Sequence, residues 1–374
     1  PELLSGSGSI KRLPAFITSK GYNRVLVVTD QGLAKLGLPG ALLAALAEEG
    51  LSYALYDGTQ PNPTIPNIEE ALDLYRRESC QAIVAFGGGS PMDCAKGVAV
   101  RAANPRKRIQ DLRGTLKVGR RPVPVFAVPT TAGTGSETTV AAVITDPATH
   151  EKYAVNDPKL IPPYAVLDPE LTLGLPPGIT GTTGMDALTH AVEAYIGRSN
   201  TRITRAAAEE AVSLIFGYLE RAYKNGSDLE ARERMLMAAH KAGIAFTRAY
   251  VGYVHAIAHQ LGGLYGMAHG LANAIILPHV LRAYGPAVDR PLARLARLVR
   301  LATDAEGDHA SATRFIEAIE AMNKRMGIPE GIPDIKDADV DLIVSRAFRE
   351  AHPLYPVPRT RPWRRSAAPD TRDA

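Results

Sequence analysis

The stretch AIVAFGGGSPMDCAKGVAVRAA, residues 82–103, decides the fold of this chain. It opens with an apolar run over residues 82–86 that is typical of a buried β-strand, turns through three consecutive glycines, and continues as a helical pattern over residues 91–103. A strand, a glycine-rich turn and a helix in this order form one unit of a parallel sheet. The sequence therefore predicts an α/β domain around these residues.

The same alternation of short strands and helices extends on both sides of this stretch. We expect strands over residues 24–29, 51–56, 82–86, 123–128 and 165–167. We expect helices over residues 39–49, 65–78 and 91–103. This alternation predicts a mainly parallel sheet with helices on both faces, which is an architecture of nucleotide-binding domains. Architecture alone does not assign a function.

The pattern changes after the segment LGLPPG, residues 173–178. Beyond it strand signals disappear, and helical periodicities follow over residues 180–196, 203–223, 229–246, 251–261, 271–283 and 292–302. We therefore predict an α/β dinucleotide-binding domain over residues 1–178, an all-helical metal and substrate domain over 179–358, and an atypical basic tail over 359–374. A small-molecule site is expected between the two domains.

Composition and charge exclude several classes of protein. The 374-residue chain has a net charge of +4, and the tail carries five arginines against two aspartates, so the body is nearly neutral and nucleic acid is not an expected partner. Residues 249–281 contain no Asp, Glu, Lys or Arg, but their four histidines, several glycines and Pro278 favour a buried helix pair over a membrane span. Two cysteines, Cys80 and Cys94, and no recognisable signal peptide predict reduced thiols and a cytoplasmic location.

Two glycine-rich loops follow apolar strands. In the first, residues 87–90 (GGGS), the glycines let backbone N–H groups approach a phosphate, and the following helix offers its unpaired N-terminal donors. The second, residues 129–137 (PTTAGTGSE), brings small residues and hydroxyls that could line the ribose or nicotinamide of a cofactor. Either loop alone could be an ordinary tight turn. Neither matches the G-x-G-x-x-G fingerprint, so glycine content does not specify the dinucleotide.

Asp30 directly follows the first clear strand. A carboxylate at this place can accept hydrogen bonds from an adenosine ribose and repel a 2′-phosphate. Aspartates that end strands are also common in turns, so a purely structural role remains an alternative.

A cluster of histidines and one aspartate stands out in the second half. Asp186 and His190 are four residues apart on one predicted helix, so both side chains can reach one ion. His255 and His259 repeat this spacing, and His269 follows ten residues later. Imidazoles with one carboxylate suit zinc or ferrous iron better than magnesium or calcium.

Not every histidine in this half is expected to bind a metal. A lone histidine on an apolar helix is more often a hydrogen-bonded core residue than a ligand, and we interpret His240 and His279 in this way. For His255 and His259 the spacing alone predicts two ligands on one helix face.

Five motifs, taken in order, resemble the iron-containing (group III) alcohol dehydrogenase family over nearly the whole chain. They are VTD at 28–30, GGGSPMDCAK at 87–96, PTTAGTGSE at 129–137, GMDALTHAVEAY at 184–195 and HAIAHQLGGLYGMAHGLANAIILPH at 255–279. Any one could arise by chance, but five in this order make the resemblance specific. It implies an N-terminal α/β dinucleotide-binding domain with a mainly parallel sheet and an all-helical C-terminal domain, as in dehydroquinate synthase, with a divalent metal in the cleft.

The resemblance also implies roles for single residues. The metal ligands of the family match Asp186, His190, His255 and His269. His259 matches the non-ligand histidine near the nicotinamide, and it is our candidate catalytic residue for relaying a proton. Asp30 matches the acidic residue that favours NAD over NADP. The other cofactor-binding positions are Gly88, Gly89, Ser90, Thr130, Thr131, Thr134 and Lys152.

The implied activity is hydride transfer between a primary alcohol or diol and NAD, with aldehyde reduction in reverse, Fe²⁺ or Zn²⁺ as the metal, and an assembly of at least two copies. Alternatives with the same fold are a polyol oxidation like that of glycerol dehydrogenase and a lyase like dehydroquinate synthase. Both relatives show a three-ligand pattern, so His190 as a fourth ligand favours the alcohol dehydrogenases. A non-enzymatic nucleotide- or metal-binding module is the remaining alternative.

The sequence departs from the family pattern in two places. Ala268 precedes His269 where the family usually has proline, which changes the loop and leaves the imidazole in place. After Arg359 the usual closing helix of the family is absent, and the segment contains the only tryptophan, Trp363. We expect this tail to be flexible or an altered terminus, and we carry no function onto it.

Overall fold

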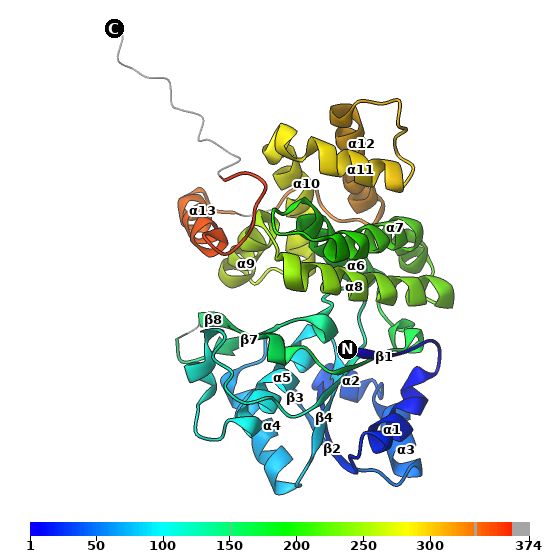
Figure 1. The fold of residues 1–374 in the computed structure, drawn as a ribbon, viewed down its shortest axis with the longest axis vertical. Coiled ribbons are helices and arrows are strands. Elements are labelled where there is room, and N and C mark those ends of the chain that lie inside the picture. Colours follow the sequence, from blue (N-terminus) through cyan, green and yellow to red (C-terminus); the bar gives the residue numbers. More distant parts are fainter. Residues whose placement is uncertain (150, 333–334, 361–374) are drawn as a thin grey trace.

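The chain forms an α/β half and a helical half, stacked one above the other (Figure 1). The structure is a computed structural model, and it describes residues 1–149, 151–332 and 335–360. The lower half in this view runs from the blue N-terminus into green and includes every described strand, whereas the upper half, green to red, contains helices only. This is the predicted fold class.

A six-stranded parallel sheet forms the centre of the α/β half, in the order β1-β9-β6-β4-β2-β3. Its strands are β1 (Glu2–Ser5), β2 (Arg24–Asp30), β3 (Ser52–Thr59), β4 (Ala82–Gly87), β6 (Val125–Pro129) and β9 (Tyr164–Leu167). The chain moves outward from β2 to β3, then returns to β4 on the other side of β2 and continues to β6. The order of the strands therefore reverses between β2 and β4, which is where open α/β sheets bind ligands.

Helices cover both faces of this sheet because successive side chains of a strand point to opposite faces. Val25 and Val27 of β2 pack in one apolar cluster with α1 (Ser9–Ser19) and α3 (Gly40–Glu48). Leu26 and Val28 pack in another, with helices of the opposite face. Those helices are α4 (Ile65–Arg77) and α5 (Gly89–Ala103), and a short α2 (Gln31–Lys35) follows β2.

A small second sheet, which the sequence analysis did not predict, lies beside α5. It has the order β5-β8-β7, with strands β5 (Gly114–Thr115), β7 (Ala141–Asp146) and β8 (Glu151–Asn156). Strands β7 and β8 pair antiparallel as a hairpin, and β8 carries Lys152. The strands are short and half-exposed, so their sequences lack the continuous apolar runs that identify the strands of the main sheet.

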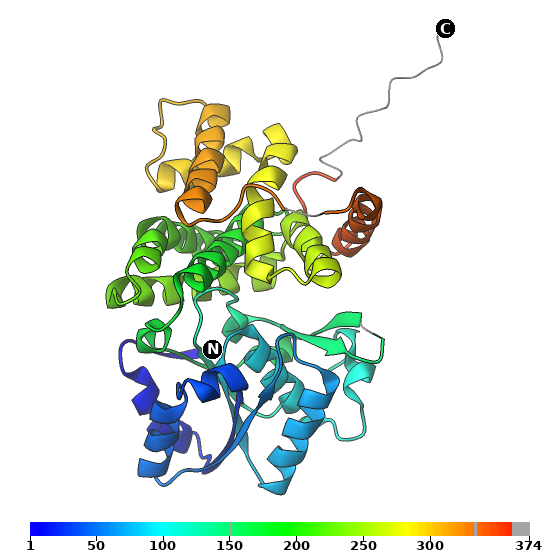
Figure 2. The same ribbon diagram turned by 180° about the vertical axis from the view of Figure 1, so that it is seen from behind.

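The helical half is built around α6, which is buried along most of its length. Its helices are α6 (Pro177–Ile196), α7 (Arg202–Lys224), α8 (Leu229–Ala249), α9 (Tyr253–Tyr265), α10 (His269–Tyr284), α11 (Asp289–Leu298), α12 (Asp308–Arg325) and α13 (Asp337–Ala351). Helix α13 packs on α9 at the edge of the bundle (Figure 2). Among the described residues, no helix has both the length and the apolarity that a membrane crossing requires.

All predicted strands and helices are present, and the structure adds others that the patterns did not reveal, including α1, α12 and α13. The charge-free segment folds as the helix pair α9 and α10, as expected. Cys80 and Cys94 are buried and free. Strand β9 ends at Leu167 and α6 begins at Pro177, and the domain boundary at residue 178 stays a prediction. Most of the predicted tail, residues 361–374, lies outside the described residues.

Candidate metal and cofactor site

Four side chains predicted from the sequence meet in the helical half. Asp186 and His190 lie one turn apart on α6, His255 lies on α9, and His269 is the first residue of α10. One potential ligand atom from each lies within 4.8 Å of the others. The structure therefore brings together residues that are up to 83 positions apart in the chain.

Burial determines the charge state of this cluster. Asp186, His190 and His255 are almost fully buried, whereas the side chain of His269 is 38% exposed. Burial lowers the pKa of all three imidazoles, that of His269 to about 4. In the described chain no Lys or Arg forms an ion pair with Asp186. The result is three neutral imidazoles around a buried carboxylate, which is a donor set suited to a cation.

Glu193, seven residues after Asp186 on α6, holds His255 in place. Its carboxylate accepts hydrogen bonds from the backbone N–H groups of Gly252 and Val254, and its Oε2 lies 2.6 Å from Nδ1 of His255. Burial raises the pKa of Glu193 to about 7, and the backbone N–H donors act in the opposite direction. A carboxylate at Nδ1 favours the tautomer of His255 in which Nε2 is left to bind a metal.

Asn273 lies among the same donor atoms. Its Nδ2 is 2.7 Å from Oδ1 of Asp186, 3.2 Å from Nε2 of His255 and 3.1 Å from Nε2 of His269. The two N–H groups of the amide are thus shared among three buried acceptors. Its own Oδ1 is buried without a hydrogen-bond partner among the described residues.

His259 lies next to this cluster but is not part of the four-residue group. Its ring stacks on that of His269, with centroids 5.3 Å apart. Its Nδ1 lies 2.6 Å from Oε1 of Glu350, a residue of α13. The same carboxylate accepts hydrogen bonds from Gln260 Nε2 and the Tyr355 hydroxyl. The spacing of His255 and His259 alone favoured two ligands, whereas in the structure His259 faces a carboxylate of its own.

The two glycine-rich loops lie side by side at the carboxyl ends of β4 and β6. Gly87 has a φ of 149°, and a Cβ there would lie 2.6 Å from Cγ of Pro91, so only glycine fits this turn. A Cβ on Gly88 would lie 3.4 Å from Oγ1 of Thr131, and one on Gly89 would lie 3.2 Å from Cγ2 of Thr134. Gly88 precedes the first turn of α5, which no side chain caps. An uncapped helix N-terminus beside small residues can bind a phosphate.

A buried lysine connects the first loop to the second. The ammonium group of Lys96 on α5 donates to oxygens of Ser136, Thr139 and Ala141 at 2.7 to 3.3 Å. Asp93, one turn earlier, accepts hydrogen bonds from the Ser136 hydroxyl and from the N–H of Val143. Burial lowers the pKa of Lys96 to about 8. The lysine therefore holds the end of the second loop and the start of β7 against α5.

The remaining predicted cofactor residues surround these loops. Lys152 Nζ donates to Oδ1 of Asn62 at 2.6 Å, and the N–H of Asn62 donates to the Ser90 hydroxyl. The N–H of Thr130 donates to Gly87 O. At the end of β2, Asp30 accepts a hydrogen bond from the N–H of Leu33 and caps α2. The structural role that the sequence left open for Asp30 is therefore present.

The second loop also contacts α6, the helix that carries Asp186 and His190. A Cβ on Gly133 would lie 2.7 Å from Cβ of Thr183, which is one turn before Asp186 on α6. In the same loop, a Cβ on Gly135 would lie 2.8 Å from the backbone of Gly243 on α8. The positive charge of Lys152 contributes to the lowered pKa of His269. The loops of the α/β half therefore reach the donor cluster of the helical half.

The two histidines expected in the core differ. His240 is buried, and its Nδ1 lies 3.1 Å from Oε1 of Glu137, which links α8 to the second loop. His279 is exposed, and its Nε2 lies 2.9 Å from the carbonyl oxygen of Glu330. Both have hydrogen-bonding partners, but only His240 lies in the core.

The sequence analysis missed several residues that shape the site. Two of them were signalled by helical spacing, because Glu193 lies two turns after Asp186 and Asn273 lies one turn after His269. Glu350 comes from a helix that was not predicted, 91 residues from its partner His259. Lys96 belongs to the motif GGGSPMDCAK, but only its burial in the structure shows that it links α5 to the second loop.

Known proteins resemble the chain over nearly its whole length. A family profile described as iron-containing alcohol dehydrogenase matches residues 1–169, and one for the C-terminal part of the Fe-containing alcohol dehydrogenase family matches residues 180–361. The NAD-dependent methanol dehydrogenase of Bacillus methanolicus is 41% identical over 94% of this chain and 92% of its own length. The 1,3-propanediol dehydrogenase of Citrobacter freundii is 40% identical over 89% and 87%. A crystal structure of a 1,3-propanediol oxidoreductase, 39% identical, superposes with a TM-score of 0.92 over 96% of this chain and 94% of that chain.

Proposed function

Because the chain belongs to the iron-containing alcohol dehydrogenase family, we propose that it transfers a hydride between a primary alcohol or diol and NAD, with aldehyde reduction in reverse. Relatives named as methanol and 1,3-propanediol dehydrogenases support small alcohols and diols as the substrate class. The observation that carries the proposal is the contact between the second cofactor loop, at Gly133, and the turn of α6 that precedes Asp186. A nicotinamide bound by the loop and a substrate bound beside the donor cluster would then be neighbours.

The donor cluster fits a divalent metal. Three neutral imidazoles and one carboxylate with mutually close ligand atoms match the ligand types of zinc and ferrous iron. We propose that Asp186, His190, His255 and His269 hold this metal. When bound, the metal supplies Lewis-acid polarisation of the oxygen of an alcohol or an aldehyde.

The residues around the cluster position these ligands. Glu193 fixes the tautomer of His255, and the Asn273 amide contacts three of the four ligand side chains. The Glu193 carboxylate, bound at the other ring nitrogen, can hold His255 in place when a substrate enters. The Asn273 amide instead lies on the nitrogens that would bind the metal, so it would have to move when the metal binds. We assign no chemical step to Glu193 or Asn273.

The cofactor is proposed to bind across the two glycine-rich loops. Gly88, Gly89 and Ser90 would bind the pyrophosphate at the start of α5, and Thr130, Thr131 and Thr134 would line the rest of the cofactor. Lys152 would lie near the nicotinamide ribose. Asp30, at the point where the strand order reverses, would accept hydrogen bonds from the adenosine ribose and repel a 2′-phosphate, which supports NAD over NADP.

His259 is the proposed proton relay. A carboxylate at Nδ1 keeps the imidazole proton on that nitrogen, so Nε2 is the atom that can accept the hydroxyl proton of an alcohol. The carboxylate of Glu350 then stabilises the imidazolium that forms. The 39% exposure of the His259 side chain leaves a path for the proton to reach water.

An absorbance assay at the reduced-nicotinamide band tests the function. The purified protein is mixed with NAD or NADP and a panel of primary alcohols, diols and aldehydes, with and without added ferrous or zinc ion. Turnover of a primary alcohol or diol that requires metal and is faster with NAD is the expected result. A complete lack of turnover with every pair would contradict the proposal.

Four further properties of this protein are proposed. Iron or zinc as the metal, a cytoplasmic location, an assembly of at least two copies and the domain boundary at residue 178 are proposals that the family and the composition support. Anaerobic purification followed by metal analysis distinguishes iron from zinc. Sedimentation of the same sample gives the number of copies.

A further inference from the structure

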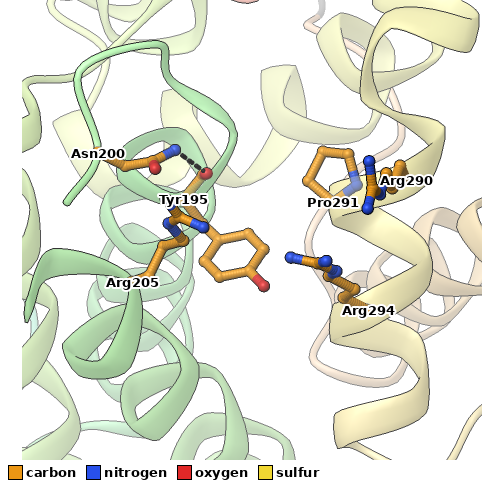
Figure 3. Close-up of a pocket in the computed structure, with 6 residues that line it drawn as sticks. All are labelled: Tyr195, Asn200, Arg205, Arg290, Pro291 and Arg294. Atoms are coloured by element: carbon orange, nitrogen blue, oxygen red, sulfur yellow. Dashed lines mark hydrogen bonds between the residues drawn. The ribbon is translucent and has the colours of Figure 1, made fainter. Parts of the chain in front are cut away.

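A cavity lies outside the candidate metal and cofactor site and shares no residue with it. It has a volume of about 330 Å³ and opens between α7 and α11, with the end of α6 as its third wall (Figure 3). Its lining residues are Tyr195, Asn200, Arg205, Arg290, Pro291 and Arg294. Half of these side chains are guanidinium groups, and Figure 3 shows the head group of Arg294 directed at Tyr195 across the cavity.

The positive charge in this cavity is not matched by ion pairs. Among the described residues no carboxylate lies within 4.0 Å of Arg205, Arg290 or Arg294, although all three groups stay protonated at any physiological pH. Arg297, one turn beyond Arg294 on α11, shows the contrast, because it pairs with Asp304 and with Asp308. All three arginines are exposed at the edge of the cavity, so an anion that enters it would meet guanidinium groups that are not held in an ion pair.

The remaining wall is rigid and polar. The hydroxyl of Tyr195 donates to Oε1 of Glu209 at 2.8 Å, which fixes the ring and places one carboxylate near the cavity. Asn200 Nδ2 donates to the carbonyl oxygens of Tyr195 and Gly197 at 2.7 and 2.6 Å, which fixes the loop between α6 and α7. The residues that line the cavity include three arginines and no carboxylate, so the lining has an excess of positive charge.

We propose that this cavity binds the phosphate group of a small molecule. A guanidinium presents its donors as a planar fork that matches two oxygens of a phosphate, and two or three such forks around one anion are a common mode of phosphate recognition. The volume is at the lower end of the range for ligand pockets, which suits a phosphomonoester of a few carbons or free phosphate and is small for a dinucleotide. The site does not depend on the proposed hydride transfer.

Calorimetric titration of the holoenzyme with inorganic phosphate tests the proposal. NAD is kept saturating so that the glycine-rich loops are occupied, and ionic strength is kept low because charge–charge attraction is screened by salt. The double variant Arg205→Ala/Arg294→Ala is expected to bind phosphate at least ten-fold more weakly than the original chain. Arg76→Ala/Arg77→Ala, which also removes two positive charges, from exposed positions on α4, is the matched control and is expected to bind normally.

Further arms of the experiment separate the possible outcomes. Tighter binding of a three-carbon phosphate ester than of inorganic phosphate identifies a metabolite, and equal binding identifies free phosphate; both support the site. The variant Arg205→Lys/Arg294→Lys keeps both positive charges but lacks the planar guanidinium groups. A phosphate affinity between those of the original chain and the double alanine variant supports bidentate contacts. Equal phosphate affinity in the original chain and the double alanine variant, or no saturable binding at all, overturns the proposal. A change in sedimentation without phosphate binding would instead identify the arginines as a contact between copies, and it also overturns the proposal.

Discussion

The donor cluster of the helical half and the two glycine-rich loops of the α/β half consist of different chemical groups. The cluster consists of one aspartate and three histidines on three helices, and the buried Glu193 orients one of them, His255. The loops offer backbone N–H groups and short side chains. The buried ammonium group of Lys96 on α5 donates hydrogen bonds to the end of the second loop and the start of β7. The difference teaches that a metal needs fixed donor atoms, whereas a dinucleotide needs room for close backbone approach. Substitutions in the two regions should therefore impair different properties, metal binding in one and cofactor binding in the other.

Loss of one donor atom should have the largest effect. Replacing His255 with Ala removes a ligand and leaves the Glu193 carboxylate without its imidazole, so we expect metal content near zero and turnover reduced by about 1000-fold or more. Metal analysis and steady-state kinetics measure this. His279→Ala, which removes an exposed histidine of α10, should change neither quantity. Full metal content and turnover in the His255 variant would reject the assigned cluster.

Loss of Lys96 should weaken the α/β half and its affinity for NAD without changing metal binding. Lys96→Met leaves the buried oxygens of Ser136, Thr139 and Ala141 without their donor, so we expect the free energy of unfolding to fall by about 3 kcal/mol. NAD affinity should fall, while metal content per folded chain stays unchanged. Denaturant unfolding and NAD titration test this, with Lys11→Met at an exposed position as the control. A variant as stable as the original chain would show that the hydrogen bonds of Lys96 do not stabilise the fold.

Replacing Glu193, which positions the proposed ligand His255, should have an intermediate effect. Glu193→Gln keeps the shape of the side chain. However, its NH₂ group replaces an oxygen that now accepts hydrogen bonds, so it must face an N–H donor. We expect metal affinity to fall by about 10- to 100-fold with little change in NAD affinity. Competition with a chelator measures it. Glu233→Gln on the exposed face of α8 should match the original chain, and unchanged metal affinity in the Glu193 variant would remove Glu193 from the site.

Loss of the partner of His259 should slow turnover and leave binding intact. Glu350→Gln removes the charge that stabilises an imidazolium, so we expect kcat to fall by about ten-fold with KM and metal content unchanged. Glu350→Asp should recover part of the loss because it restores the carboxylate. A fall in metal content of equal size would instead show that α13 only supports the fold.

The smallest effect is expected at Asp30. Serine can still cap α2, so Asp30→Ser keeps the local structure and removes the negative charge. We expect the preference for NAD over NADP, as the ratio of kcat/KM values, to fall by about five-fold, because about 1 kcal/mol of ribose recognition is lost. An unchanged ratio with unchanged stability would leave Asp30 with its structural role alone.

Much of the fold could be predicted because its signals are local. The apolar runs of β2, β4 and β6 and the periodicities of α6 to α10 are read within ten to twenty residues, and all appear in the structure. The hairpin of β7 and β8 and the helices α12 and α13 carried weaker signals, because their partly exposed positions mix apolar with charged residues. Their place depends on long-range packing.

The sequence by itself determined which residues could act together. Asp186 and His190 share a helix face through their spacing, and Gly87 adopts a turn that only glycine permits. Only the tertiary structure decided which partners these residues meet. It joins His255 and His269 to Asp186, pairs His259 with Glu350, and gathers three arginines from two helices around one cavity. The physical reason is that helix and turn chemistry act over a few residues, whereas distant side chains meet only when separate helices pack into one core.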